Sequence, residues 1–112
     1  MLTTVVELAE FLRQAKALMT DAERKELVDY LAANPEAGVS LGGGLRKLRF
    51  SREGGGKSGG LRSVHFYQPS RGLPVFLMSV FAKNAKANLT PKEEVTMILT
   101  GDRIAATYKG KT

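Results

Sequence analysis

The ten residues from Leu73 to Ala82 constrain the fold of this chain more than any other segment. They read Leu-Pro-Val-Phe-Leu-Met-Ser-Val-Phe-Ala and contain no charged side chain. A strand that is apolar on both faces belongs inside a sheet, where other elements cover both of its sides. The sequence therefore predicts a central strand here, with a packed layer on each face of the sheet.

The first 36 residues predict a strand followed by two helices. Residues 2–6 are short and β-branched, which favours a strand. Apolar residues recur at helical spacing over residues 8–19, which is typical of an amphipathic helix. The capping box Thr20-Asp-Ala-Glu23 opens a second helix, and Asn34-Pro35 ends it. Because almost no loop separates the two helices, we expect them to form a hairpin.

From Val39 onwards the hydrophobic period changes to that of strands. Leu45–Phe50 alternates, and we expect Leu61–Gln68 and Leu73–Ala82 to be the next two strands. Eight of the 12 glycines lie between Gly42 and Gly60, where we expect flexible loops on either side of the first of these strands.

A second capping box, Thr90-Pro-Lys-Glu93, opens a C-terminal helix with proline at its first helical position. Gly101 either stops this helix or is followed by a further helical segment, Ile104–Tyr108. The element order β-α-α-β-β-β-α predicts one α+β domain over residues 1–112. In this domain the helical hairpin packs on a twisted antiparallel sheet, and a C-terminal helix completes the fold.

The charge of the chain is concentrated in one half. Residues 1–36 hold 4 Lys and Arg against 7 Asp and Glu, whereas residues 45–92 hold 10 Lys and Arg and a single acid, Glu53. A net charge of +9 in one half, within a chain of +6, points to a polyanionic partner. A membrane surface fits less well, because these basic residues lie in strand-like sequence and not along one amphipathic helix.

Several classes of protein are disfavoured by composition. The chain has no cysteine and a single histidine, and its basic half has one carboxylate, so we expect no zinc or two-magnesium site and no cofactor. We see no signal peptide and no apolar run of about 18 residues, so we expect a cytoplasmic protein that does not enter a membrane. Gly54–Gly59 resembles a phosphate-binding glycine loop, but the strand expected after it lacks the helix N-terminus that such loops require.

Cationic side chains remain as the candidate chemistry. Lys47 and Arg49 share one strand face, Arg62 begins the next strand, and Lys83 and Lys86 follow the last one. Because opposite side chains of antiparallel neighbours lie about 5 Å apart, the first three can converge on an open sheet face opposite the helices. We expect His65 to be either a structural, partly buried imidazole or a site residue.

Such a cluster suits RNA cleavage by the ribose 2′-hydroxyl. Cations bind the scissile phosphate, stabilise its developing charge and can depress the pKa of a lysine enough to make it a general base. No metal is required for this chemistry. The same residues could also form a phosphate-binding surface without catalysis.

Three stretches resemble the HigB branch of the RelE/ParE toxin superfamily. They are Gly43–Phe50, Gly56–Arg62 and Phe81–Thr90, with Phe-Ala-Lys-Asn at the start of the third as the most distinctive part. Glu10–Ala15 and Leu31–Gly38 are similar as well, so the resemblance covers nearly the whole chain.

The resemblance implies a RelE-like fold and a toxin of a type II toxin–antitoxin pair. RelE-like members enter the ribosomal A site and cut mRNA there, leaving a 2′,3′-cyclic phosphate. The implied partners are the ribosome, mRNA and a cognate antitoxin that is HigA-like or RelB-like. We expect an acidic antitoxin segment on or near the basic face of residues 45–92, or alternatively an antitoxin along the helical hairpin.

The resemblance also implies roles for individual residues. Lys47 and Arg49 match the lysine pair of the catalytic strand, Arg62 matches the arginine that opens the next strand, and Lys83 stands near a further basic site residue. The predicted catalytic residues are therefore Lys47, Arg49, Arg62 and Lys83, and the predicted RNA- or ribosome-binding residues are Arg46, Arg52, Lys57 and Lys86. Tyr108 is the candidate for the C-terminal tyrosine that stacks on the substrate base. The histidine-based sites of some other HigB toxins are not reproduced, because His65 lies within a strand.

Three functions are consistent with these observations. The first is a ribosome-dependent mRNA endoribonuclease that needs no metal. The second is a non-enzymatic toxin, since the ParE branch shares the fold and inhibits DNA gyrase by binding. The third is an RNA- or ribosome-binding module without toxicity, which is disfavoured because no aromatic pair lies on the basic strands. The basic cluster and the HigB-like stretches favour the first.

Overall fold

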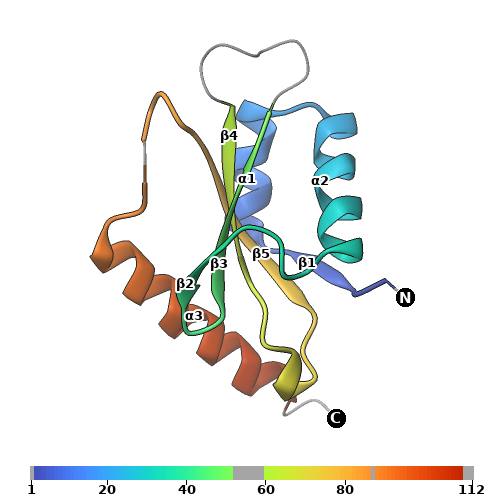
Figure 1. Cartoon of the computed structure of the whole chain (residues 1–112), viewed down its shortest axis with the longest axis vertical. Coiled ribbons are helices and arrows are strands. Elements are labelled where there is room, and N and C mark those ends of the chain that lie inside the picture. Colours follow the sequence, from blue (N-terminus) through green and yellow to red (C-terminus); the bar gives the residue numbers. More distant parts are fainter. Residues whose placement is uncertain (1, 52–59, 87, 110–112) are drawn as a thin grey trace.

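The apolar segment forms strand β5 (Val75–Ala82), which lies inside a five-stranded sheet. The computed structural model describes residues 2–51, 60–86 and 88–109 (Figure 1). β5 pairs in parallel with β1 (Val5–Glu7) and antiparallel with β4 (Leu61–Phe66). β3 (Leu45–Phe50) and β2 (Val39–Gly42) complete the order β1-β5-β4-β3-β2. Seven of the eight β5 residues are buried, as expected for a strand covered on both faces.

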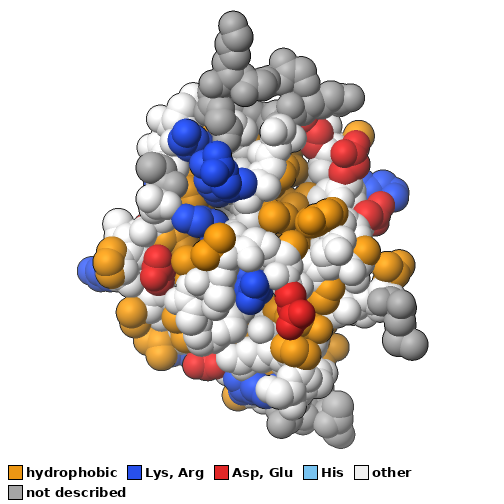
Figure 2. Space-filling view, viewed as in Figure 1, with side chains coloured by type: hydrophobic (Ala, Val, Ile, Leu, Met, Phe, Trp, Pro, Cys, Tyr) orange, Lys and Arg blue, Asp and Glu red, His pale blue; other side chains and the backbone are white. Residues whose placement is uncertain are grey.

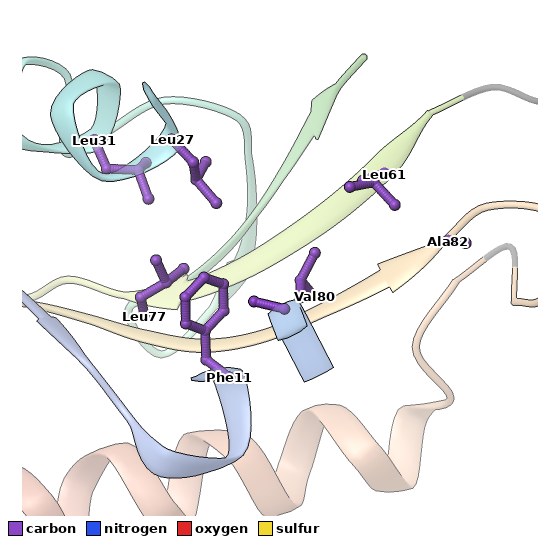
Figure 3. Packing of buried hydrophobic residues seen from close by; sticks show 8 residues of the cluster. Phe11, Leu27, Leu31, Leu61, Leu77, Val80 and Ala82 are labelled. Atoms are coloured by element: carbon purple, nitrogen blue, oxygen red, sulfur yellow. The ribbon is translucent and has the colours of Figure 1, made fainter. Parts of the chain in front are cut away.

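The helical hairpin of α1 (Ala9–Leu18) and α2 (Asp21–Ala33) covers one face of the sheet. The capping box at its turn is formed in both directions. Glu23 N donates to Thr20 Oγ1 at 3.0 Å, and Thr20 N donates to Glu23 Oε1 at 2.8 Å. Apolar side chains of both helices meet those of β4 and β5 in one core (Figure 3), which contains Phe11, Leu27, Leu31, Leu61, Leu77, Val80 and Ala82.

Helix α3 (Pro91–Lys109) packs on the other face of the sheet (Figure 1). It lies near Leu45 at the start of β3 and Phe66 at the end of β4. The second capping box is also formed, between Thr90 and Glu93. The core beneath α3 contains Leu45, Val64, Phe66, Phe76 and Ala105. Within the described ranges, none of the helices combines the length and the apolarity that crossing a membrane requires.

The predicted α+β fold and both capping boxes are confirmed, and three details are added or corrected. The sheet is mixed and not purely antiparallel, because β1 runs parallel to β5. The segment 39–42, where the strand-like period begins but where no separate strand was expected, forms an edge strand by pairing with β3. Helix α3 passes through Gly101 without a break and continues to Lys109.

Gly101 is accommodated in α3 because the helix lies against an aromatic ring at that point. A Cβ at this position would lie 2.4 Å from Cδ1 of Phe66, which is fully buried. The absence of a side chain therefore allows the close approach of α3 to β4.

We expect Gly101→Ala to destabilise the protein, although alanine is the better helix former. The gain in helix propensity is about 1 kcal/mol, whereas forcing a methyl into a packed core costs about 1–3 kcal/mol. Chemical denaturation of this variant tests the expectation, with Thr100→Ala on the exposed side of α3 as the control. An increased free energy of unfolding for Gly101→Ala would contradict this packing.

Candidate functional site

The pairing of β3 with β4 brings three cationic residues onto one face of the sheet. Arg49 stands directly opposite Arg62, and Lys47 stands opposite Val64 on the same face. Cβ atoms of residues paired in this way lie about 4.5–5.5 Å apart. The strand alternation places Leu48 and Phe50 on the opposite face, packed against the core beneath the hairpin.

These three residues line a cavity of about 450 Å³. Its remaining described wall is formed by Gly38, Val39, Leu48 and Asn88, so no acidic side chain is among the described lining residues. Gly38 brings the connection from α2 close to β3. It has φ +86°, and a Cβ there would lie 2.2 Å from the carbonyl oxygen of Lys47. Glycine is therefore required to close this side of the cavity.

Asn88 is a lining residue that the sequence reasoning missed. Lys47 Nζ donates a hydrogen bond of 2.7 Å to Asn88 Oδ1, across 41 positions of the chain. This contact ties the ammonium group to another lining residue of the cavity and leaves the Asn88 amide N–H groups as additional donors. The sequence marks Asn88 only as a polar residue just before a capping box, which predicts nothing about Lys47.

Arg62 is buried, with 5% of its surface exposed. Burial lowers the pKa of Arg62, and the neighbouring charge of Arg49 acts in the same direction. An arginine nevertheless stays protonated in proteins. A cation held at reduced dielectric beside a second cation favours an incoming anion more strongly than the same pair in water. The cavity is therefore electrostatically suited to a phosphate group.

The expectation of an open sheet face is only partly correct. Helix α3 covers the end of this face that carries Val64 and Phe66. It does not cover the other end, where Arg49 pairs with Arg62. The site is consequently a cavity bounded by a helix-covered region and by the Gly38 connection. Figure 2 shows a group of Lys and Arg side chains over the strands on this side of the molecule.

The model of the "RelE toxin of RelE / RelB toxin-antitoxin system" family matches residues 4–111 of this chain. The chain belongs to the RelE toxin family. The match covers nearly all of the sequence, and the α+β architecture with a helical hairpin on a central sheet agrees with it. Family membership makes the chain a toxin of a toxin–antitoxin system whose partner is an antitoxin.

Two other predicted basic residues of the toxin lie near the cavity but not among its described lining. Lys83 is exposed in the turn after β5, where its backbone N–H donates to the carbonyl of Gly60 at 3.2 Å. Lys86 is half-buried, pairs with Glu93 and lies 5.8 Å above the ring of Phe81. Phe81 is in turn the β5 neighbour of Arg62.

The three remaining predicted basic residues are not among the described lining residues of the cavity. Arg46 lies on the opposite face of β3 and donates to the carbonyls of Ala37 and Gly38 at 3.3 and 3.1 Å. It therefore holds the same connection that closes the cavity. Arg52 and Lys57 lie outside the described residues.

His65 and Tyr108 are both placed away from the cavity. His65 is fully buried on the hairpin face, and its Nε2–H donates to the carbonyl of Pro35 at 2.9 Å. The geometry therefore supports a structural role for His65. Tyr108, in the last turn of α3, packs edge-on against Phe76, with the ring centroids 5.9 Å apart. Phe76 pairs with Phe66, which lies four residues along β4 from Arg62.

The burial of His65 predicts a pH dependence of stability. Burial lowers the pKa of His65, Arg46 lowers it further, and the hydrogen bond to Pro35 opposes both effects. As the pH falls below about 6.5, the unfolded chain takes up a proton that the folded chain does not. The free energy of unfolding should therefore decrease below that pH and not change from this group above it.

Denaturant unfolding at pH 7.5, 6.5 and 5.5 tests this dependence, with His65→Gln expected to show a flatter profile than the wild type. Because the chain has one histidine, NMR titration reports its pKa without ambiguity. A value at or above 6.5, or equal slopes for the two proteins, would refute the assignment.

Proposed function

We propose that this toxin is a ribosome-dependent mRNA endoribonuclease of the HigB-like branch that cleaves RNA without a metal ion. The observation that carries the proposal is the convergence of Lys47, Arg49 and Arg62 in one cavity whose described lining holds no acid. The residue-level resemblance to RelE-type catalytic strands supports the same assignment. The ribosome and mRNA are the partners that this activity requires.

In the proposed reaction the 2′-hydroxyl oxygen of the ribose attacks the adjacent phosphorus. The bond from phosphorus to the 5′-oxygen of the next nucleotide breaks, which leaves a 2′,3′-cyclic phosphate and a 5′-hydroxyl. The 2′-hydroxyl loses its proton to a base, and the leaving 5′-oxygen gains one from an acid. All atoms of the reaction come from the RNA and from transferred protons.

Each of the three cationic residues in the cavity has a role in this scheme. Arg49 and Arg62 stand opposite each other and bind the non-bridging phosphate oxygens, where negative charge grows in the transition state. Arginine suits this task because its planar guanidinium presents paired donors to a phosphate. Lys47, held by Asn88, supplies a third cation beside the reacting groups.

The other basic residues act at the periphery in this proposal. Lys83 is exposed beside the cavity end of β5 and is placed to contact RNA near the scissile bond. Arg52, Lys57 and Lys86 bind ribosomal or messenger RNA phosphates through charge. Arg46 contributes indirectly, because it holds the Gly38 connection that bounds the cavity.

A toxin that only binds gyrase would not require a buried arginine opposite a second arginine.

We expect Lys47→Ala and Arg62→Ala each to reduce mRNA cleavage by about 100-fold or more and to abolish growth inhibition. The removal of one donor that stabilises a developing oxyanion typically costs rate factors of about 10²–10³. Primer extension on a reporter mRNA after induced expression measures the cleavage, and growth of the same cultures measures toxicity.

Lys16→Ala is the matched control, because Lys16 is an exposed lysine on α1, within the helical hairpin on the other face of the sheet. It removes the same charge and should leave cleavage unchanged. Thermal unfolding of each purified variant separates loss of activity from loss of fold. A folded Arg62→Ala protein with full cleavage would exclude Arg62 from the site.

A further inference from the structure

The Lys47 ammonium group requires a partner if it is to take one defined position in the cavity. A lysine carries its charge at the end of a flexible four-carbon chain, unlike the planar fork of an arginine. Arg49 lies two residues along the same face of β3, and its charge repels that of Lys47. A hydrogen-bond acceptor in the cavity wall therefore decides where the Lys47 ammonium group lies.

Asn88 supplies this acceptor. It carries the only side-chain oxygen among the described lining residues of the cavity. This oxygen, Oδ1, accepts the 2.7 Å hydrogen bond from Lys47 Nζ. A hydrogen bond from an ionised donor is stronger than one between two neutral groups. The contact therefore restrains the flexible end of Lys47 against the cavity wall.

The Asn88 side chain is neutral, and this property matters for an anionic substrate. A carboxylate at the same place would hold the ammonium group as well, but it would cancel the lysine charge and repel a phosphate. The carboxamide accepts the hydrogen bond and leaves the charge in place. No described lining residue carries an acid, so the positive charge of Lys47 is not cancelled by any of them.

The backbone of Asn88 lies in the connection from β5 to α3, which is anchored on both sides. Leu89, the next residue, is buried in the core beneath α3. Thr90 then forms its capping box with Glu93. Glu93 also pairs with Lys86, two residues before Asn88. The exposed carboxamide of Asn88 is therefore attached to a backbone whose position the core and the start of α3 determine.

We propose that Asn88 is a positioning residue for RNA cleavage, whose neutral carboxamide holds the Lys47 ammonium group towards the scissile phosphate without cancelling its charge. This role rests on the proposed nuclease activity and acts through Lys47, not through contact with the reacting atoms. A displacement of about 1 Å in a reacting group can cost a rate factor of about 10². Loss of the hydrogen bond should therefore reduce the rate of cleavage more than the affinity for the substrate.

Purified toxin in excess over ribosomes that translate a reporter mRNA provides the test. Varying the toxin concentration gives the maximal cleavage rate and the half-saturating toxin concentration separately. Asn88→Ala removes the acceptor, and Asn88→Ser shortens the side chain so that its oxygen no longer reaches Lys47. Asn88→Asp keeps an acceptor and adds a negative charge. Asn84→Ala is the matched control, because Asn84 is an exposed asparagine of the same connection and is not a described lining residue.

We expect Asn88→Ala and Asn88→Ser each to lower the maximal cleavage rate by about 10-fold and to leave the half-saturating concentration nearly unchanged. Asn88→Asp should raise the half-saturating concentration by about 10-fold, because its charge repels the RNA phosphates. The control should change neither quantity. Thermal unfolding verifies that each variant is folded, and the serine variant replaces the alanine variant if the latter is unstable.

Three results would overturn the role of Asn88 while wild-type cleavage is intact. The first is an unchanged maximal rate for the alanine and serine variants. The second is a loss confined to the half-saturating concentration, which would mean that Asn88 itself binds RNA or the ribosome. The third is full activity of Asn88→Asp. Absence of cleavage by the wild-type toxin would instead contradict the nuclease proposal, so the two failures are distinguishable.

Discussion

Two arginines, Arg49 and Arg62, stand opposite each other on neighbouring antiparallel strands. Like charges in this position destabilise a sheet, and one of the two is buried. The cores on both faces maintain this arrangement. A one-residue slip of β3 would turn Leu48 and Phe50 away from the hairpin core and direct Lys47 and Arg49 into it. The packing that stabilises the fold thereby fixes a cationic pair that would be unfavourable on its own.

The local features of the sequence were sufficient for much of the fold. The alternation in Leu45–Phe50 predicted which side chains share a face, and the register with β4 agrees with it. Both capping boxes predicted helix starts correctly, because the hydrogen bonds of a capping box form within four consecutive residues. The apolar run 73–82 predicted an interior strand, since no exposed position could accept it.

Features that depend on long-range contacts could not be predicted. Asn88 meets Lys47 across 41 positions, and a lone asparagine before a helix gives no sign of that contact. The burial of Arg62 depends on what packs around its strand, which a strand pattern does not reveal. Strand β2 forms by pairing with β3 and not by strong strand propensity of Val-Ser-Leu-Gly. Helix α3 continues through Gly101, where the missing side chain leaves room for the ring of Phe66.

Mapping mRNA cuts in growing cells tests ribosome-dependent cleavage most directly. Primer extension would compare a translated reporter with the same transcript lacking its start codon, after induced expression of the toxin. The proposed function predicts cuts confined to the translated reading frame and absent from the untranslated transcript. Equal cutting of both transcripts would contradict ribosome dependence, and growth arrest without any cut would contradict the nuclease assignment.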